Sequence, residues 1–205
     1  MAKKTLTLRQ WTSSTFFGWL AGIVLLVVFS AFFESVGIDG LQFHAGAAIA
    51  LGVGGAQWLR LRSRLTIDSR WIWFSLIGFV FPFALYDIIA YAFDFSLERF
   101  FLPVCVTIGA LTATLFQFAI LRRFASSRPW LWVNPSAWLT SLVMVVAVEF
   151  TPRISIHSMV VFVVNLALIL GGGVVLGLIS GPVMTQIVND NQRRGGKEVY
   201  EPEMK

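Results

Sequence analysis

Six apolar segments, each about as long as a lipid bilayer is thick, restrict what this chain can fold into. A transmembrane helix needs about 20 mostly apolar residues to cross about 30 Å of hydrocarbon. The segments that meet this length are Thr12–Phe33, Leu41–Leu61, Trp71–Phe93, Phe100–Leu121, Trp130–Phe150 and His157–Val188. Backbone groups within lipid must bond to one another, and the alternating pattern of barrel strands is absent. We therefore predict an all-α integral membrane protein with six transmembrane helices.

The overall composition agrees with a membrane location. The chain has 205 residues, of which 57% are hydrophobic and 13% are charged, whereas soluble domains have about 25% charged residues. The net charge of +5 does not indicate a nucleic-acid partner, because the basic residues flank the apolar segments. The first segment is longer than the apolar part of a signal peptide, and no small-residue cleavage site follows it. We expect this segment to be retained.

The distribution of basic residues predicts an orientation. Of the 16 lysines and arginines, all except Arg99 and Arg153 flank the N-terminus, the second loop, the fourth loop or the tail. Short loops rich in lysine and arginine lie in the cytoplasm. We expect a bacterial inner-membrane protein with both termini in the cytoplasm. Reporters placed at Asp39, Ser96 and Ile154 should then lie outside.

The sequence contains an internal repeat with an offset of 60 residues. This offset relates Trp11 to Trp71 and Gln57 to Gln117, and it brings together further pairs: Gly18 with Gly78, Phe33-Glu34 with Phe93-Asp94, and Leu61-Arg62 with Leu121-Arg122. A looser third copy starts at Trp130 and Trp132 and ends near Gln186. A repeat of this kind fixes the architecture. We predict three tandem helical hairpins, at about 11–62, 71–122 and 130–188, in a single domain over 1–188.

The polar residues 189–205 follow the last hairpin. They include Gly195, Gly196 and Pro202 together with charges of both signs. Such a composition cannot bury much apolar surface. We expect a disordered cytoplasmic tail.

The two helices of each hairpin differ in composition. The first, rising helices are aromatic, and tryptophan at their cytoplasmic starts is expected to lie at headgroup level. The second, returning helices have small residues at four-residue spacing, which lets helix backbones approach closely. The glycines predicted to pack helices are Gly52, Gly109, Gly173, Gly177 and Gly181. We predict that the returning helices form a central trio, capped by Gln57, Gln117 and Gln186, with the aromatic helices outside.

One run resembles a pattern in a known group of proteins. Residues Gly52-Val53-Gly54-Gly55-Ala56-Gln57-Trp58-Leu59-Arg60-Leu61-Arg62, and the weaker copy Gln117-Phe118-Ala119-Ile120-Leu121-Arg122, resemble hairpins of uncharacterised bacterial polytopic membrane proteins. In those proteins glycine-rich helices end in Gln-Trp-Leu-x-Leu-Arg. The second copy here lacks the tryptophan, and the third lacks Leu-x-Leu-Arg. The resemblance implies a membrane fold and no activity.

Asp87 is the leading candidate for a functional residue, because acids within membrane spans are costly and usually have a function. We expect it to face the bundle interior and to bond to a group of another helix. Asp87→Asn is expected to keep stability and remove any ligand response. Other polar residues at that level or within the spans complete the candidate ligand-binding set: Tyr86, Glu149, His44, His157 and Asn165. The histidines and acids do not have the close spacing along the chain that is usual for metal ligands. We therefore do not expect a metal site.

Two classes of function follow, and neither implies a particular cofactor. No P-loop or H-E-x-x-H motif is present, so nothing in the sequence supports an enzyme. The first class is a binding or transport-type protein with a pocket open to the outer face; the plan matches the substrate-binding subunits of vitamin transporters, which is an analogy of fold only. The second is an accessory protein that packs in a larger membrane complex or binds lipid or pigment. The expected partners are the bilayer and another membrane protein or a second copy.

Overall fold

The computed structural model describes residues 5–38, 40–153 and 157–198, and within them the chain is helical and contains no strand. The sequence prediction of an all-α protein is confirmed there. Five helical segments are long and apolar enough to cross a membrane. They are built on α1 (Leu8–Ser35), α4 (Arg70–Phe93), α5 (Phe101–Leu121), α6 (Trp130–Ala147) and α7 (Ser158–Glu198). The short 3₁₀ segments Glu98–Phe100 and Val148–Arg153 extend α5 and α6.

The remaining apolar segment is helical but irregular. It consists of α2 (Phe43–Ile49), the π-helical turn η1 (Ala50–Gly54) and α3 (Gly55–Leu61), which follow one another without a break. The π-helical turn lies against α1 where both helices have small residues. A methyl group added to Gly18 would be 2.7 Å from Cβ of Ala56, and one added to Gly52 would collide with the backbones of Gly18 and Gly22. Glycine at these positions allows the two backbones to touch.

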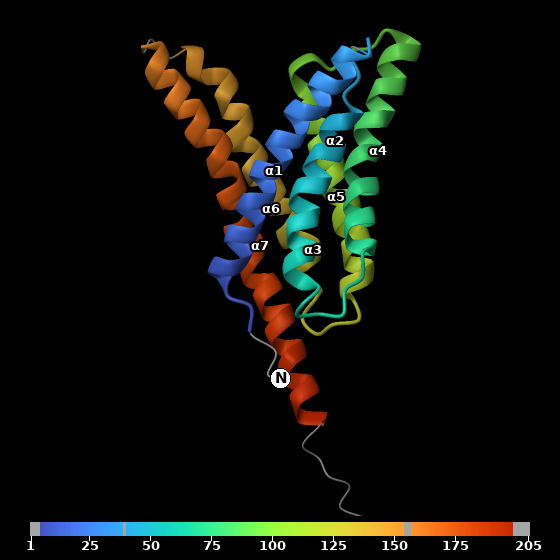
Figure 1. Cartoon of the computed structure of the whole chain (residues 1–205), viewed down its shortest axis with the longest axis vertical. Coiled ribbons are helices and arrows are strands. Elements are labelled where there is room, and N and C mark those ends of the chain that lie inside the picture. The colour runs from blue at the N-terminus through green and yellow to red at the C-terminus, as the bar shows by residue number, and fades with distance from the viewer. Residues whose placement is uncertain (1–4, 39, 154–156, 199–205) are drawn as a thin grey trace, which may run out of the picture.

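The helices form a closed ring in which each packs against its neighbours in sequence, and α7 packs back against α1. Figure 1 shows that the ring is not cylindrical. The pair α6–α7 diverges from α2, α4 and α5 toward one end, so that the molecule has the outline of a V. The helices come together at the other end, where α1 begins. We call the splayed side the open end and the other side the closed end.

The predicted central trio of returning helices is wrong. In the described part of the chain, α5 makes no extensive contact with α3 or α7. The small residues contact rising helices instead: a methyl group at Gly177 would be 2.7 Å from Cα of Thr12 in α1, and one at Gly109 would be 2.7 Å from the ring of Phe79 in α4. Four-residue spacing predicts close approach but does not identify the partner helix, and the nearest partner here is a neighbour in the ring.

The tail prediction also needs correction. Helix α7 does not stop near Val188 but continues through Asn189 to Glu198. Asn189 bonds to the backbone of Leu6 through both amide atoms, at 3.1 and 3.3 Å, and Asp190 accepts a hydrogen bond of 2.7 Å from Ser126. These tertiary contacts hold the polar continuation of the helix. Residues 199–205 lie outside the described residues.

The connections at the closed end carry five arginines, which are Arg62, Arg64, Arg122, Arg123 and Arg128. Arg64, between α3 and α4, donates to the carbonyl oxygen of Arg60 at 2.9 Å and to Oε1 of Gln10 at 3.0 Å. Burial, together with the positive charge of Arg60, lowers the pKa of Arg64, although an arginine remains charged in proteins. Gln10 also completes a capping box with Thr7 at the start of α1. The α3–α4 connection is thereby tied to the first turn of α1.

Candidate functional site

Three tryptophans, from α1, α4 and α6, meet at the closed end. The side chains of Trp11, Trp71 and Trp130 are fully buried. The ring of Trp130 lies 6.3 Å from that of Trp11 and 6.2 Å from that of Trp71, in the range of favourable aromatic contacts. These side chains face the interior of the bundle and do not anchor the helices in the headgroups as the sequence predicted. Trp73 and Trp132, two residues further along, are exposed instead.

A polar layer lies one helical turn above the three tryptophans. Thr15, Ser75 and Asn134 each follow a tryptophan by four residues, and all are buried. The amide of Gln117 donates to Ser75 at 2.9 Å and accepts from Nε1 of Trp130 at 3.3 Å. Asn134 donates to Thr114 at 2.7 Å. Buried polar groups that are bonded in this way fix the register of the helices around them.

The glutamines do not form the symmetric cap that the sequence predicted. Gln57 and Gln117 are buried, but Gln186 is exposed. Nε1 of Trp11 donates instead to Ser180 of α7 at 3.0 Å. Nε1 of Trp71 is buried without a partner among the described residues. A serine of α7 is therefore the partner of Trp11, whereas a glutamine of α5 is the partner of Trp130.

A second aromatic layer lies two turns above the first. Trp138 packs against Trp19 with ring centroids 6.0 Å apart and against Phe79 with centroids 4.6 Å apart. Each of these three residues follows its tryptophan by eight positions. Neither this set nor the polar layer was predicted from the sequence, although their shared spacings of eight and four residues from the tryptophans are the signal that identifies them. The rising helices thus supply the side chains on the axis, which corrects their predicted outside position.

Apolar residues of the connections close the bundle beneath the tryptophans. Leu65 and Ile67 precede α4, Phe124 follows α5, and Leu6 precedes α1; all four are buried. They form one cluster with the three tryptophans and the last apolar turns of α7. A solute cannot cross this end without displacing that cluster.

Above the second aromatic layer lies a cavity of about 270 Å³ between the two arms of the V. Its lining comes from α1, α2, η1, α5, α6 and α7, and every lining residue is apolar. Trp19 and Trp138 form part of the wall, and Nε1 of Trp19 is already bonded to the carbonyl oxygen of Ile169 at 2.9 Å. An apolar cavity of this kind is poorly hydrated and favours an apolar occupant.

A second pocket, of about 470 Å³, lies next to the first toward the open end. The two pockets share Leu26 and Leu102. The second also has polar lining residues, including Ser30, Glu34 and His44. Nε2 of His44 lies 3.0 Å from Oγ of Ser30, whereas Nδ1 is buried and has no hydrogen-bond partner in the described structure. Together the two pockets present an apolar interior with a polar mouth.

Asp87 has a structural partner. Its carboxylate accepts hydrogen bonds from the backbone N–H groups of Gln42 at 2.9 Å and Phe43 at 2.8 Å, at the start of α2. The side chain is buried, as expected from the cost of exposing an acid to lipid. The carboxylate therefore caps α2 and complements its dipole. Tyr86 and Asp87 line a third pocket of about 380 Å³, which also includes Glu98.

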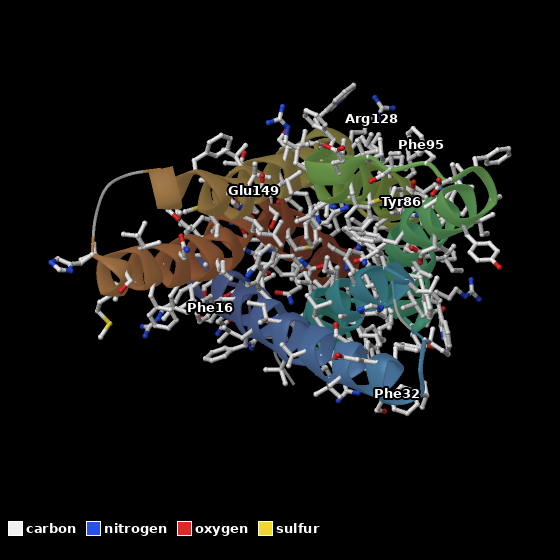
Figure 2. The ribbon with its side chains drawn as sticks, turned by 90° about the horizontal axis from the view of Figure 1, so that it is seen from above. Phe16, Phe32, Tyr86, Phe95, Arg128 and Glu149 are labelled. Atoms are coloured by element: carbon white, nitrogen blue, oxygen red, sulfur yellow. The ribbon has the colours of Figure 1, made fainter. Side chains whose placement is uncertain are left out.

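The other predicted ligand residues lie on the opposite arm. Glu149 and His157 are exposed near the ends of α6 and α7, and Asn165 accepts a 2.6 Å hydrogen bond from Thr151. Figure 2 shows Tyr86 and Glu149 on separate ribbons. The structure thus brings Asp87, Tyr86 and His44 to one arm, beside two neighbouring pockets, and Glu149, His157 and Asn165 to the other. Among the described residues no group of three potential metal ligands occurs.

Comparison with models of known protein families, with characterised proteins and with solved structures finds no match to this chain. The functional interpretation therefore rests on the pockets and on their position in the fold.

Proposed function

We propose that the protein binds an amphipathic, lipid-like molecule between its two arms, from the outer side of a bacterial inner membrane. The observation that supports this proposal is the wholly apolar cavity at the centre of the V, which shares the lining residues Leu26 and Leu102 with a polar pocket at the open end. A polar solute finds no hydrogen-bonding group in the deeper cavity. An acyl chain or another apolar group fits its chemistry.

The proposal places six spans in the membrane. The sixth span is α2–η1–α3, which covers residues 43–61 and at helical rise is about 28 Å long. The closed end lies in the cytoplasm because the arginines of the 62–69 and 122–129 connections gather there. The three pairs of rising and returning segments are then tandem hairpins of one repeat. Reporter fusions at Asp39, Ser96 and Ile154 test this arrangement, and an inside location for any of them contradicts it.

The closed end favours a protein that binds its ligand from the outer side over one that transports it. The tryptophans and connection residues block the cytoplasmic side, whereas α6–α7 stands apart from α4–α5 at the open end. Transport of the bound molecule would require this cytoplasmic cluster to separate. Binding alone requires no such change, and we therefore propose a binding protein first and a transporter second.

The alternative is an accessory protein whose cavity receives an apolar helix of another membrane protein or of a second copy. The observation that favours it is the exposed apolar surface along both arms, which includes Val27, Phe32, Phe162 and Val163; Phe32 projects away from the bundle in Figure 2. Lipid also covers such surfaces, so the surface alone does not distinguish the two functions. The kind of molecule that occupies the cavity distinguishes the two functions.

A matched pair of substitutions in α6 tests the proposal. Val145 lines the cavity, and Val143, two residues earlier, is 67% exposed. Val145→Trp fills the cavity, so the amount of lipid-like molecule that stays bound after gentle detergent extraction should fall, as measured by native mass spectrometry. Val143→Trp should leave the bound amount at the wild-type level. Equal retention in all three proteins contradicts the proposal, and a co-purifying protein lost only with Val145→Trp supports the accessory function instead.

A further inference from the structure

We propose that the polar pocket at the open end holds a primary ammonium group, so that the ligand is an amphiphile with an amine head and an apolar tail. This inference rests on the proposed function and specifies its ligand class. The tail occupies the cavity beside Trp19 and Trp138, and the head lies beyond Leu26 and Leu102, among Ser30, Glu34 and His44.

His44 supplies the first argument. Its side chain is only 8% exposed, yet its Nδ1 has no hydrogen-bond partner among the described residues. A buried polar atom without a partner is unfavourable, and a bound hydrogen-bonding group removes that cost. If Nε2 carries the proton and donates to Ser30, Nδ1 presents a lone pair. Because Nδ1 is enclosed, the ring, which lines the pocket, must turn before this nitrogen accepts a hydrogen bond from an ammonium group.

The charge of the pocket supplies the second argument. Among the described residues that line it, Glu34 is the one acid and none is a lysine or an arginine. An ammonium group has three donors and no acceptor, which suits a carboxylate and an imidazole nitrogen. The aromatic ring of Phe33 also lines the pocket, 5.6 Å from the ring of His44. Aromatic faces attract cations, so all three side chains favour a positively charged head over an anionic one.

A comparison of head groups tests the assignment. The probes are an alkylamine, an alcohol and an alkyl sulfate of equal chain length, each brominated at the end of the chain. Bromine quenches tryptophan fluorescence on contact, and Trp19 and Trp138 line the cavity. Trp73→Phe and Trp132→Phe remove the two strongly exposed tryptophans, which are 59% and 79% exposed, and reduce quenching from bulk lipid. The protein is placed in phosphatidylcholine nanodiscs at neutral pH.

The amine should bind about tenfold more tightly than the alcohol, which is the effect of about one charge-assisted hydrogen bond. Glu34→Gln and His44→Phe should each reduce amine binding toward that of the alcohol and leave alcohol binding unchanged. Glu34 is exposed, so its substitution tests the pocket even if His44→Phe disturbs folding. Glu149→Gln changes an exposed acid of the other arm and should have no effect.

The outcomes separate this inference from the proposed function. Equal binding of amine and alcohol, with both lost in Val145→Trp, overturns the amine assignment and leaves the cavity as a lipid-binding site. Quenching by no probe overturns the proposed function as well. Doping the nanodiscs with phosphatidylethanolamine distinguishes two sources of the amine: competition identifies an aminophospholipid, and its absence identifies a single-chain amine.

Discussion

Trp138 and Phe79 pack with their rings tilted by 53° and their centroids 4.6 Å apart at the axis of the bundle, although α6 and α4 do not adjoin in the ring of helices. Large aromatic side chains bridge the gap that the returning helices were expected to fill. The contact joins the α6–α7 arm to the rest of the molecule just below the apolar cavity. It therefore marks the level at which the V closes.

Trp130 should be the most important single side chain for stability at the closed end. It is fully buried and contacts the rings of both Trp11 and Trp71. Trp130→Ala is expected to lower the free energy of unfolding by about 3–5 kcal/mol. Thermal unfolding in a mild detergent measures the change. Trp132→Ala is the control, since Trp132 is 79% exposed, and equal losses from the two variants contradict the central position of Trp130.

Gln117 should contribute through its hydrogen bonds rather than through its size. Gln117→Leu leaves Ser75, Nε1 of Trp130 and Asn134 with fewer partners in a buried layer. Unsatisfied buried polar groups cost about 1–3 kcal/mol, so the melting temperature should fall. Gln186→Leu changes the exposed glutamine of α7 and should have little effect. Indistinguishable melting curves for the two variants argue against a structural polar layer.

A pair of glycines three residues apart tests the contact between α1 and the π-helical segment. Gly52 faces the backbones of Gly18 and Gly22, whereas a methyl group at Gly55 meets nothing within 4 Å. Gly52→Ala should destabilise the protein by about 1–3 kcal/mol through overpacking. Gly55→Ala should be neutral or slightly stabilising, because alanine favours a helix over glycine. Chemical unfolding in detergent compares the two, and a neutral Gly52→Ala shows that the helices can move apart at no cost.

Asp87 should behave as a helix cap. Asp87→Ala removes the acceptor of two backbone N–H groups of α2 and is expected to cost about 1–2 kcal/mol. Asp87→Asn retains one acceptor oxygen and should cost less, which replaces the expectation that it leaves stability intact. Glu149→Ala, at an exposed acid, is the control in thermal unfolding measurements. Full stability of Asp87→Ala contradicts the capping role and returns Asp87 to the list of candidate ligand groups.

The sequence predicts the helical elements well because their determinants are local. Hydropathy alone identifies the long apolar helices, and the offset of 60 residues between Trp11 and Trp71 predicts that the rising helices are equivalent. The same pattern does not show that Trp11 and Trp71 are buried together. Tryptophan is also common at membrane surfaces, and only the buried residues four and eight positions later distinguish the two cases.

The other incorrect predictions concern contacts between residues that are far apart in the sequence. Gly177 signals a close approach, but its contact with Thr12 depends on how the first and last helices close the ring. Because Asn189 is polar, the sequence predicts that it belongs to the tail. Its hydrogen bonds to Leu6 nevertheless join the two ends of the described chain. The pockets arise from the divergence of α6–α7 from the other helices (Figure 1), and no spacing along a single helix specifies that divergence.

The most direct test of ligand binding between the arms is a photo-crosslinking titration. A diazirine amino acid replaces Val145 in the cavity or Val143 on the exposed face of the same helix. The protein is illuminated in nanodiscs with increasing amounts of a long-chain amphiphile, and the adducts are counted by mass spectrometry. We predict adducts at position 145 that saturate and are competed by unlabelled amphiphile, and adducts at position 143 that rise in proportion to the amphiphile. Unsaturable labelling at both positions contradicts a specific site between the arms.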